Sequence, residues 1–250
     1  MDADDFLRKF DLKDLKFERR DDHELRKVSE GVFDRQTMLA LRRLAAKGAL
    51  TEFRSVVSQG KEATIFYGLK GKKEVAVKIY SVEASEFRRM EKYVQGDPRF
   101  KEVKNRRHFI YQWAQKEYKN LSRVSDVVDC PAPIEVFNNI LVMEFIGKKG
   151  VAAPKLKDSE ITKPLEYCER ILDYIKAMYG RGLVHGDLSE YNILDDGRPV
   201  LIDFSTGVLL EHPLSGELLE RDLRNVLKFF SGYGIKKDFN ETLSYVKKND

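Results

Sequence analysis

The sequence predicts an α+β fold with two lobes, in which an antiparallel β-sheet with one long helix precedes a reduced, mainly helical second lobe. Three observations lead to this prediction. Residues 50–80 alternate strand-forming runs with glycine-containing turns, residues 106–124 follow a helical apolar pattern, and helical patterns return after residue 164. A chain of 250 residues, of which 42% are hydrophobic, can fill the cores of two small lobes.

Composition and charge argue against several classes of protein. The net charge of +4 indicates no particular partner, and two cysteines, Cys130 and Cys168, do not make a disulfide framework, which favours a reduced, cytoplasmic setting. The first five residues are acidic, unlike a signal peptide, and no apolar run approaches the ~20 residues of a membrane span. His23 and His108 lack partners at ligand-like spacing, so no zinc site is indicated.

We expect three parts: a helical leader packed on the first lobe (1–49), the first lobe (50–146) and the second lobe (147–250). In the leader, residues 34–47 predict a helix that Asp34 caps and Gly48 ends. Its apolar face would be formed by Met38, Leu41, Leu44 and Ala45.

The first lobe begins with three predicted strands, at residues 51–57, 64–69 and 74–80. Residues 58–65 can be aligned with the glycine-rich pattern G-x-G-x-x-G-x-V, with Ser58 and Ala63 replacing two glycines. Gly60 alone would suit an ordinary hairpin. The run V-A-V-K follows at the distance expected of a phosphate-covering hairpin and its lysine.

Lys78 closes that run on an apolar strand, where a charged side chain is costly unless it is paired. The helix predicted at residues 106–124 offers Glu117 as a partner, on the same side as Trp113. We therefore expect a Lys78–Glu117 ion pair. The alternative is a lysine at a sheet edge that points to solvent.

Residues 81–107 are highly charged and poorly periodic, and Gly96-Asp97-Pro98 breaks any helix, so part of this stretch is expected to be a flexible surface loop. Its basic residues form either a solvated face or a contact surface for a phosphate backbone. They are Arg88, Arg89, Lys92, Arg99, Lys101, Lys104, Arg106 and Arg107.

A second hairpin is predicted at residues 134–137 and 140–145, after the rigid connector C-P-A-P. It ends in the apolar run L-V-M-E-F-I-G, a hinge whose backbone groups can read an adenine edge. Further helices are predicted at residues 164–181, 215–230 and 240–248.

Residues 183–207 carry two polar clusters, each at the end of an apolar run. The first contains Asp187 and, five positions later, Asn192, and the second begins with Asp203. Between them Asp196-Gly197 predicts a tight hairpin turn, which would bring Asn192 and Asp203 to the same end of two paired strands. We expect the three side chains to converge.

Such a convergence is typical of phosphoryl transfer. One carboxylate and one amide oxygen can hold magnesium against phosphates, while a second carboxylate positions the attacking hydroxyl. The patterns H-G-D-L-S-E-Y-N and D-F-S match H-R-D-L-x-x-x-N and D-F-G of protein kinases closely. The alternative, that these residues only cap turns and end a strand, does not explain their joint spacing.

Seven motifs together resemble the RIO family of atypical serine/threonine protein kinases, in particular the archaeal-type Rio1 branch, over residues 32–230. They are S-Q-G-K-E-A, V-A-V-K, W-A-Q-K-E-Y-K-N-L, C-P-A-P, L-V-M-E-F-I-G, L-V-H-G-D-L-S-E-Y-N-I-L and I-D-F-S. The resemblance implies a two-lobed protein-kinase-like fold, ATP with Mg²⁺ or Mn²⁺, and a role in maturation of the small ribosomal subunit and its RNA. A protein substrate, including the chain itself, is also implied.

The resemblance further implies roles for individual residues. Asp187 is the catalytic aspartate, and Asn192 and Asp203 bind the metal. Lys78, paired with Glu117, binds phosphate, and an ATPase cycle would pass through a phospho-aspartate at Asp203. The remaining nucleotide contacts are Ser58, Gly60 and Lys61 for phosphates, the backbone of Glu144 and Ile146 for adenine, and Ile65, Ala76, Met143 and Leu194.

Two departures from ordinary protein kinases separate the alternatives. Gly186 replaces the usual arginine, and no A-P-E motif follows Asp203, which argues against switching by activation-loop phosphorylation and against generic peptide phosphorylation. Other hypotheses are a small-molecule phosphotransferase like the aminoglycoside and choline kinases, a compact tRNA-modification kinase, and a nucleotide-regulated binding platform. The short second lobe counts against the first of these, and the 57 residues before Ser58 count against the second, whose nucleotide loop lies near its N-terminus. The third is disfavoured by the intact set Lys78, Asp187, Asn192 and Asp203.

Overall fold

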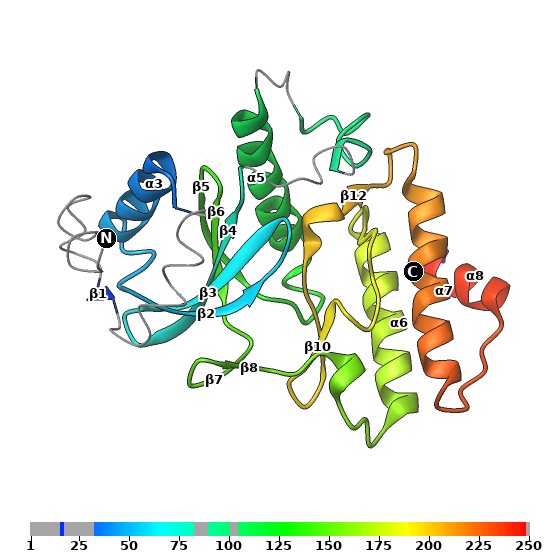
Figure 1. Ribbon diagram of the computed structural model, residues 1–250. Coiled ribbons are helices and arrows are strands. Elements are labelled where there is room, and N and C mark those ends of the chain that lie inside the picture. Colours follow the sequence, from blue (N-terminus) through cyan, green and yellow to red (C-terminus); the bar gives the residue numbers. More distant parts are fainter. Residues whose placement is uncertain (1–15, 18–32, 83–89, 101–104, 249–250) are drawn as a thin grey trace. The chain divides into compact units, whose positions relative to one another are not determined.

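The computed structural model describes residues 16–17, 33–82, 90–100 and 105–248 (Figure 1). The chain forms two compact units, which are described separately below. Unit 1 takes its described residues from Met1–Phe87, Lys101–Tyr118 and Ala132–Ala152, and unit 2 from Arg88–Phe100, Lys119–Pro131 and Ala153–Asp250. Each unit is therefore assembled from separate stretches of sequence.

Unit 1 is built on a six-stranded sheet with the order β1-β2-β3-β4-β6-β5. Neighbouring strands are antiparallel, as predicted, except that β1 pairs with β2 in parallel. The two-residue β1 was not predicted, because so short a strand shows no periodicity. The strands are β1 (Lys16–Phe17), β2 (Glu52–Gln59), β3 (Ala63–Lys70), β4 (Lys73–Tyr80), β5 (Pro133–Phe137) and β6 (Ile140–Glu144).

Helix α3 (Arg35–Ala46) packs its predicted apolar face into the main core of unit 1. Asp34 caps the helix by accepting a hydrogen bond from the Thr37 N–H at 2.8 Å. Met38, Leu41 and Leu44 are fully buried with the core residues of β2, β3 and β4, which include Phe53, Phe66 and Val77. Because β4 is buried along most of its length, any charge on it must find a partner inside the protein.

A short hairpin, β7 (Gly147–Lys148) and β8 (Val151–Ala152), follows the strand β6 and lies against β3 and β4. The Gly150 N–H donates to Glu74 Oε1 at 3.0 Å, and the Tyr67 hydroxyl donates to the same oxygen at 2.7 Å. Gly150 has a φ of +78°, and a Cβ there would lie 3.2 Å from the Tyr67 ring, so glycine suits both the turn and the contact. The sequence did not predict this hairpin.

Unit 2 is mainly helical, as predicted. Helix α6 packs against both α7 and α8, and Pro164 begins α6 where its missing N–H costs nothing. Two small antiparallel sheets, β9–β12 and β10–β11, lie beside the helices. The elements are α6 (Pro164–Gly180), α7 (Ser215–Ser231), α8 (Phe239–Lys247), η1 (Leu156–Asp158), η2 (Phe204–Thr206), β9 (Leu183–Val184), β10 (Ile193–Asp195), β11 (Pro199–Leu201) and β12 (Val208–Leu209).

Part of residues 81–107 was predicted to be a flexible surface loop, and the structure shows that residues 90–100 of this stretch belong to unit 2 and are partly buried in it. Met90, Tyr93 and Asp97 are buried. The Arg99 guanidinium donates to both carboxylate oxygens of Asp97, at 2.9 Å to Oδ1 and 2.6 Å to Oδ2, and to Asn120 Oδ1 at 2.5 Å. Arg99 therefore forms an internal ion pair with Asp97 and is not part of a solvated basic face.

Arg107 is also occupied within the protein. This residue is the second of helix α5 (Arg106–Val124), which was predicted with these bounds. Its Nη2 donates to Asp34 Oδ2 at 2.5 Å in unit 1. Burial opposes ionisation of Asp34, but Arg107 and Thr37 together hold the pKa of its carboxyl below the usual value. Four other members of the predicted basic stretch lie outside the described residues: Arg88, Arg89, Lys101 and Lys104.

Neither cysteine is bonded: Cys130 and Cys168 are both free and buried. Within the described residues, no helix is both long enough and apolar enough to cross a membrane.

Candidate functional site

The ion pair expected between Lys78 and Glu117 is present in unit 1. Lys78 Nζ donates to Glu117 Oε1 at 2.9 Å, and the two side chains are only 7% and 1% exposed. The Tyr80 hydroxyl donates to the other oxygen of Glu117. Strand β4 thus presents a lysine whose position is fixed by helix α5.

Side chains of the predicted nucleotide site share one face of the sheet in unit 1. Ile65 lies opposite Lys78 in the β3–β4 ladder, and Ala76 lies opposite Met143 in the β4–β6 ladder. Paired residues project to the same side, and residues two apart on one strand do so as well. Ile65, Ala76, Lys78 and Met143 therefore line a common face, with Ala76 and Met143 largely buried.

The turn between β2 and β3 and the end of β6 complete the predicted contacts in unit 1. Ser58, Gly60 and Lys61 are exposed. The Gly60 N–H donates to the Ala63 carbonyl at 2.9 Å, and a Cβ on Gly60 would approach that oxygen to 3.3 Å, so the turn is tight.

At the hinge after β6, the Glu144 N–H donates to the Ala132 carbonyl at 2.9 Å. Glu144 could therefore offer an adenine its carbonyl oxygen and not its N–H. Ile146 is half-buried, and the neighbouring Phe145 ring packs against Tyr67 with 5.1 Å between ring centroids.

In unit 2 the predicted hairpin brings Asn192 to the segment that carries Asp203. Ile193 pairs with Leu201, and the Ile202 N–H donates to the Asn192 carbonyl at 3.0 Å. The half-buried Leu194 lies next to them in β10.

Asp187 lies beside Asn192 and within electrostatic reach of Asp203. Asn192 Nδ2 donates to Asp187 Oδ2 at 3.1 Å and to its backbone carbonyl at 2.8 Å. Although the Asp187 carboxyl reaches solvent, surrounding protein displaces much of its hydration, and this burial raises its pKa above 3.8, with the negative charge of Asp203 adding to the effect. The two carboxylates are thus close enough to repel each other.

Asp203 occupies an uncommon backbone conformation. Its φ of +62° lies in the left-handed region, which aspartate tolerates better than most residues, and Ser205 Oγ donates to its Oδ1 at 2.8 Å. The side chain is exposed. The backbone and Ser205 therefore both fix the direction of this carboxylate.

Buried His185 links the two polar clusters. Its Nε2 lies 3.0 Å from the Ile202 carbonyl, its ring packs against Phe204, and the Thr206 hydroxyl donates to its backbone carbonyl at 3.1 Å. These contacts hold the Asp187 loop against the Asp203 segment.

The sequence analysis missed two residues of α7 that hold the Asp187 loop. Buried Asp222 accepts hydrogen bonds from the N–H groups of Gly186, at 2.7 Å, and Leu188, at 2.8 Å. Arg221 Nη2 donates to the Gly186 carbonyl and lies 4.0 Å from Asp187 Oδ1. The available signal was a charged residue, Asp222, on an otherwise apolar helical face.

Gly186 is required by the backbone. Its φ is +79°, and a Cβ would lie 3.1 Å from the Thr206 carbonyl oxygen. Arginine, which most protein kinases have at this position, would be strained here. Arg221 instead brings a guanidinium to the Asp187 loop from α7.

We expect Asp222→Asn to change the pH dependence of stability. Burial raises the pKa of Asp222 to about 7, although two N–H groups and Arg221 favour its ionised form. Because this value lies above the 3.8 of an unfolded aspartate, the folded protein binds more protons between the two values, and the free energy of unfolding falls as pH rises through that window.

The asparagine variant cannot ionise at this position, so its unfolding free energy should decline less between about pH 4 and about pH 7. Urea unfolding across this range measures the difference. Asp196→Asn, an exposed change of the same kind, is the control and should follow the wild type. Equal slopes for all three proteins would contradict the assignment.

We expect Lys78→Met to abolish the phosphoryl transfer expected from the sequence and to destabilise the protein. It leaves Glu117 buried without its cation, which should lower the free energy of unfolding by about 3–5 kcal/mol. The double variant Lys78→Met/Glu117→Gln removes the unpaired charge, so it should recover most of the stability and none of the activity. Lys73→Met, on the exposed start of the same strand, is the control. Activity in the double variant would contradict the role of Lys78.

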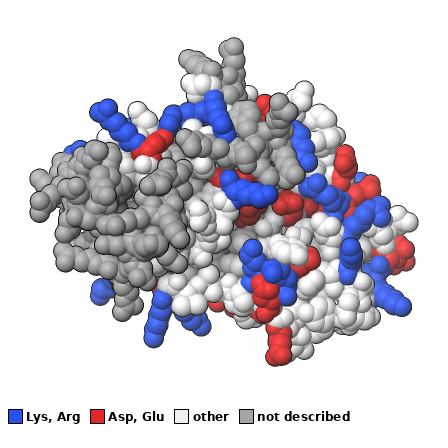
Figure 2. Space-filling model, in the orientation of Figure 1, with Lys and Arg blue, Asp and Glu red and all other residues white. Residues whose placement is uncertain are grey.

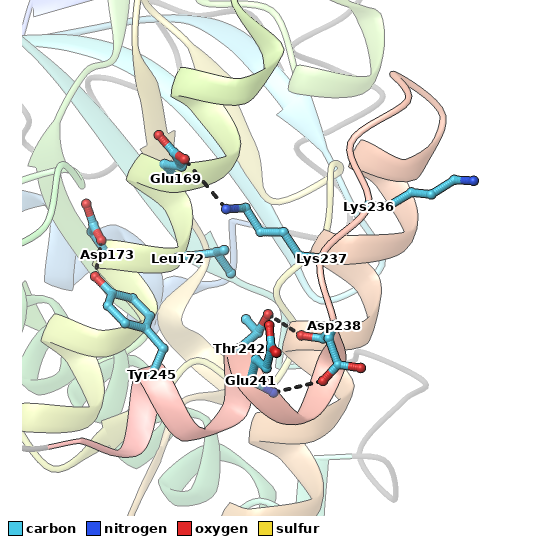
Figure 3. Close-up of a pocket in the computed structure, with 9 residues that line it drawn as sticks. All are labelled: Glu169, Leu172, Asp173, Lys236, Lys237, Asp238, Glu241, Thr242 and Tyr245. Atoms are coloured by element: carbon cyan, nitrogen blue, oxygen red, sulfur yellow. Dashed lines mark hydrogen bonds and ion pairs between the residues drawn. The ribbon is translucent and has the colours of Figure 1, made fainter.

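A separate hollow in unit 2 lies between α6 and α8 and measures about 530 Å³ (Figure 3). Most of its polar side chains satisfy one another: Lys237 pairs with Glu169 at 3.6 Å, the Tyr245 hydroxyl donates to Asp173 at 2.5 Å, and Asp238 caps α8. These contacts attach α8 to α6, and we assign the hollow a structural role.

Comparison with protein families and curated proteins gives consistent matches. A family model described as the RIO domain matches residues 64–242. The RIO-type serine/threonine-protein kinase Rio1 of Methanocaldococcus jannaschii is 42% identical over 242 residues, which cover 96% of this chain and 83% of that protein. Its namesake in Haloferax volcanii is 40% identical over 224 residues, which cover 88% and 77%.

The serine/threonine-protein kinase RIO1 of Saccharomyces cerevisiae is 36% identical over 84% of this chain and 50% of its own length. Among solved structures, the Rio2 kinase–ADP/Mg²⁺–phosphoaspartate complex from Chaetomium thermophilum is similar with a TM-score of 0.65, 22% identity, and coverage of 85% of this chain and 67% of that one. Identity this low shows the fold alone. The predicted α+β, kinase-like fold is confirmed.

Proposed function

Because the chain belongs to the RIO family of atypical serine/threonine protein kinases, we propose that it binds ATP and transfers its γ-phosphoryl group to a protein hydroxyl or to water. The family identified from the sequence motifs is confirmed by these matches. The observation that carries the proposal is the placement of Asp187, Asn192 and the segment of Asp203 together in unit 2.

In this proposal each side chain has a distinct role. Lys78, held by Glu117, binds nucleotide phosphate with a fixed positive charge. Asp187 orients the attacking hydroxyl or water and receives its proton, and the raised pKa of Asp187 suits a group that must accept one. Arg221 steadies the Asp187 loop through the Gly186 carbonyl.

Magnesium would be held by the side-chain oxygen of Asn192 and the carboxylate of Asp203. The repulsion between Asp187 and Asp203 marks a place where a divalent cation is electrostatically favoured. In the part of the chain that the structure describes, no group of three or more His, Cys, Asp or Glu side chains could hold a metal ion alone. That suits magnesium, or manganese, which shares its coordination with phosphates and water and neutralises their charge when bound.

We further propose an ATPase cycle through Asp203. The Asp203 carboxylate would attack the γ-phosphorus, the bond to the bridging oxygen would break, and ADP would leave. Water would then hydrolyse the acyl phosphate and restore the carboxylate. The exposure of Asp203 and the hydrogen bond from Ser205 that directs it support this role. A phosphoaspartate occurs in the related Rio2 complex.

For the physiological role we propose maturation of the small ribosomal subunit in a reduced cytoplasm. The Rio1 motifs support the first part, and the free, buried thiols of Cys130 and Cys168 are compatible with the second. The predicted contact of residues 88–107 with ribosomal RNA is weakened, because Arg99 and Arg107 are ion-paired within the protein.

Incubation of the purified protein with γ-³²P-labelled ATP and magnesium tests the proposed function. We expect labelled protein, free labelled phosphate, or both, and no labelled product without the metal. Acid-labile, hydroxylamine-sensitive label on the protein would identify an acyl phosphate at an aspartate, and acid-stable label would identify a serine or threonine. No label and no free phosphate would refute the proposal.

A further inference from the structure

Five lysines gather at one end of the sheet in unit 1. Three lie at the turn between β3 and β4, and two lie at the tip of the β7–β8 hairpin. All five side chains are exposed. We call this set the lysine surface: Lys70, Lys72, Lys73, Lys148 and Lys149.

Hydrogen bonds hold the two turns together. Glu74, which follows Lys73, accepts from the Gly150 N–H at 3.0 Å and from the Tyr67 hydroxyl at 2.7 Å. The hairpin turn that carries Lys149 is therefore fixed beside the start of β4. Figure 2 shows blue side chains projecting at the lower left of that face, the side on which Figure 1 draws β7 and β8.

The charges of the lysine surface are not neutralised locally. In the described part of the chain, none of the five lysines forms an ion pair, while the nearby carboxylates are already engaged. Glu52 pairs with Arg54 at 2.7 Å, and Glu74 is bound to Tyr67 and Gly150. Like charges on adjoining turns repel one another, so an external anion would be electrostatically favoured at this surface.

The turn of the β7–β8 hairpin holds Lys149 in a backbone conformation that is unfavourable for lysine. Lys149 has a φ of +53° and Gly150 a φ of +78°, which is the pattern of a type I′ turn. Asparagine or aspartate is usual at the first of these positions, and lysine there is strained. The ammonium group of Lys149 is therefore presented to solvent at a cost in backbone strain.

We propose that the lysine surface binds the phosphate backbone of RNA. Several compact ammonium groups on flexible stems match a row of phosphates, whose condensed counterions they release. The surface goes beyond the proposed phosphoryl transfer, because none of its residues is assigned to the nucleotide.

The observations favour RNA over two other polyanionic partners. A membrane-bound surface would present an amphipathic helix or several large apolar side chains for insertion. Among the described residues of these two hairpins, the large apolar side chain that is exposed is Val151 in β8, at 72%. An acidic protein would be met by exposed aromatic or unpaired arginine side chains at the centre of the interface, whereas Tyr67 beside the two turns is buried and Arg54 is paired with Glu52 at 2.7 Å.

The test compares two variants of the full chain with equal changes in charge. The first replaces the five lysines of the lysine surface with glutamine. The control replaces five exposed lysines of unit 2 in the same way: Lys119, Lys228, Lys236, Lys247 and Lys248. The probes are a fluorescein-labelled single-stranded RNA of mixed sequence and its fully paired duplex, measured by anisotropy across a potassium chloride series.

We expect the first variant to bind RNA at least about tenfold more weakly than the control, with a slope of log affinity against log salt reduced by up to about 4. Equal affinities and slopes for both variants would overturn the proposal. Two further probes, phosphatidylserine vesicles and polyglutamate, test the other polyanionic partners. The proposal would also be overturned if the lysine-surface variant lost vesicle binding but kept RNA binding, or if polyglutamate of equal charge displaced RNA from the wild type.

ATP hydrolysis by the same proteins separates this inference from the proposed function. Both variants should hydrolyse ATP like the wild type. A wild-type protein that binds RNA through these lysines, yet neither hydrolyses ATP nor becomes labelled by it, would refute phosphoryl transfer and leave the lysine surface unaffected. Normal hydrolysis with equal RNA binding by both variants would refute the lysine surface alone.

Discussion

Asp203→Asn is expected to abolish metal-dependent binding and turnover of ATP. Asparagine also tolerates the left-handed backbone at this position, so the change removes the negative charge with little strain. Loss of a charged ligand to the cation removes several kcal/mol of charge stabilisation, or about 100- to 10,000-fold in rate. Asp203→Ala should have the same effect on activity.

Calorimetric titration with ATP, with and without magnesium, and measurement of phosphate release check this result. The difference between the two titrations should vanish in the variant. Asp196→Asn, at the exposed tip of the β10–β11 hairpin, removes the same charge and should behave like the wild type. Normal magnesium-dependent turnover in Asp203→Asn would rule out the metal role of this residue.

Asp187→Asn is expected to retain ATP affinity and lose phosphoryl transfer by about 100- to 10,000-fold. Asparagine preserves the shape of the side chain and can still accept the hydrogen bond from Asn192 Nδ2, so the loop should keep its geometry. It cannot accept a proton from the attacking hydroxyl or water. Binding and chemistry should therefore separate at this residue.

Single-turnover hydrolysis and nucleotide titration measure the two quantities independently. Ser189→Ala, two positions along the same loop and with no role in the proposal, is the control. If ATP affinity falls as much as the rate does in Asp187→Asn, Asp187 is a metal or structural residue.

The parts of the site that the sequence predicts depend on local chemistry. A lysine on an apolar strand demands a carboxylate, and the helical spacing from Trp113 selects Glu117. The Asp-Gly turn sets the register of β10 with β11 and so brings Asn192 to the Asp203 segment. In both cases the contact could be predicted from the residue types and their spacing within the segments involved.

The parts that the sequence analysis missed depend on contacts between distant residues. Asp222 meets the N–H of Gly186 from 36 positions away, and Arg107 meets Asp34 from 73 positions away. No local pattern says which carboxylate an arginine will find, so Arg99 and Arg107 were assigned to a basic surface. The strands β7 and β8 have two residues each, too few to show alternation.

The interleaving of the two units along the chain has a consequence for biosynthesis. Arg88–Phe100 and Lys119–Pro131 belong to unit 2, yet they leave the ribosome before Ala153–Asp250, which contains the helices they join. At ~5–20 residues per second, these segments wait roughly ten seconds for their partners. Meanwhile the apolar side chains of Met90 and Tyr93 have no core to enter. A nascent chain halted after Ala152 would therefore expose these side chains. Neither unit corresponds to one continuous segment of the sequence, so neither can be expressed alone as a simple truncation.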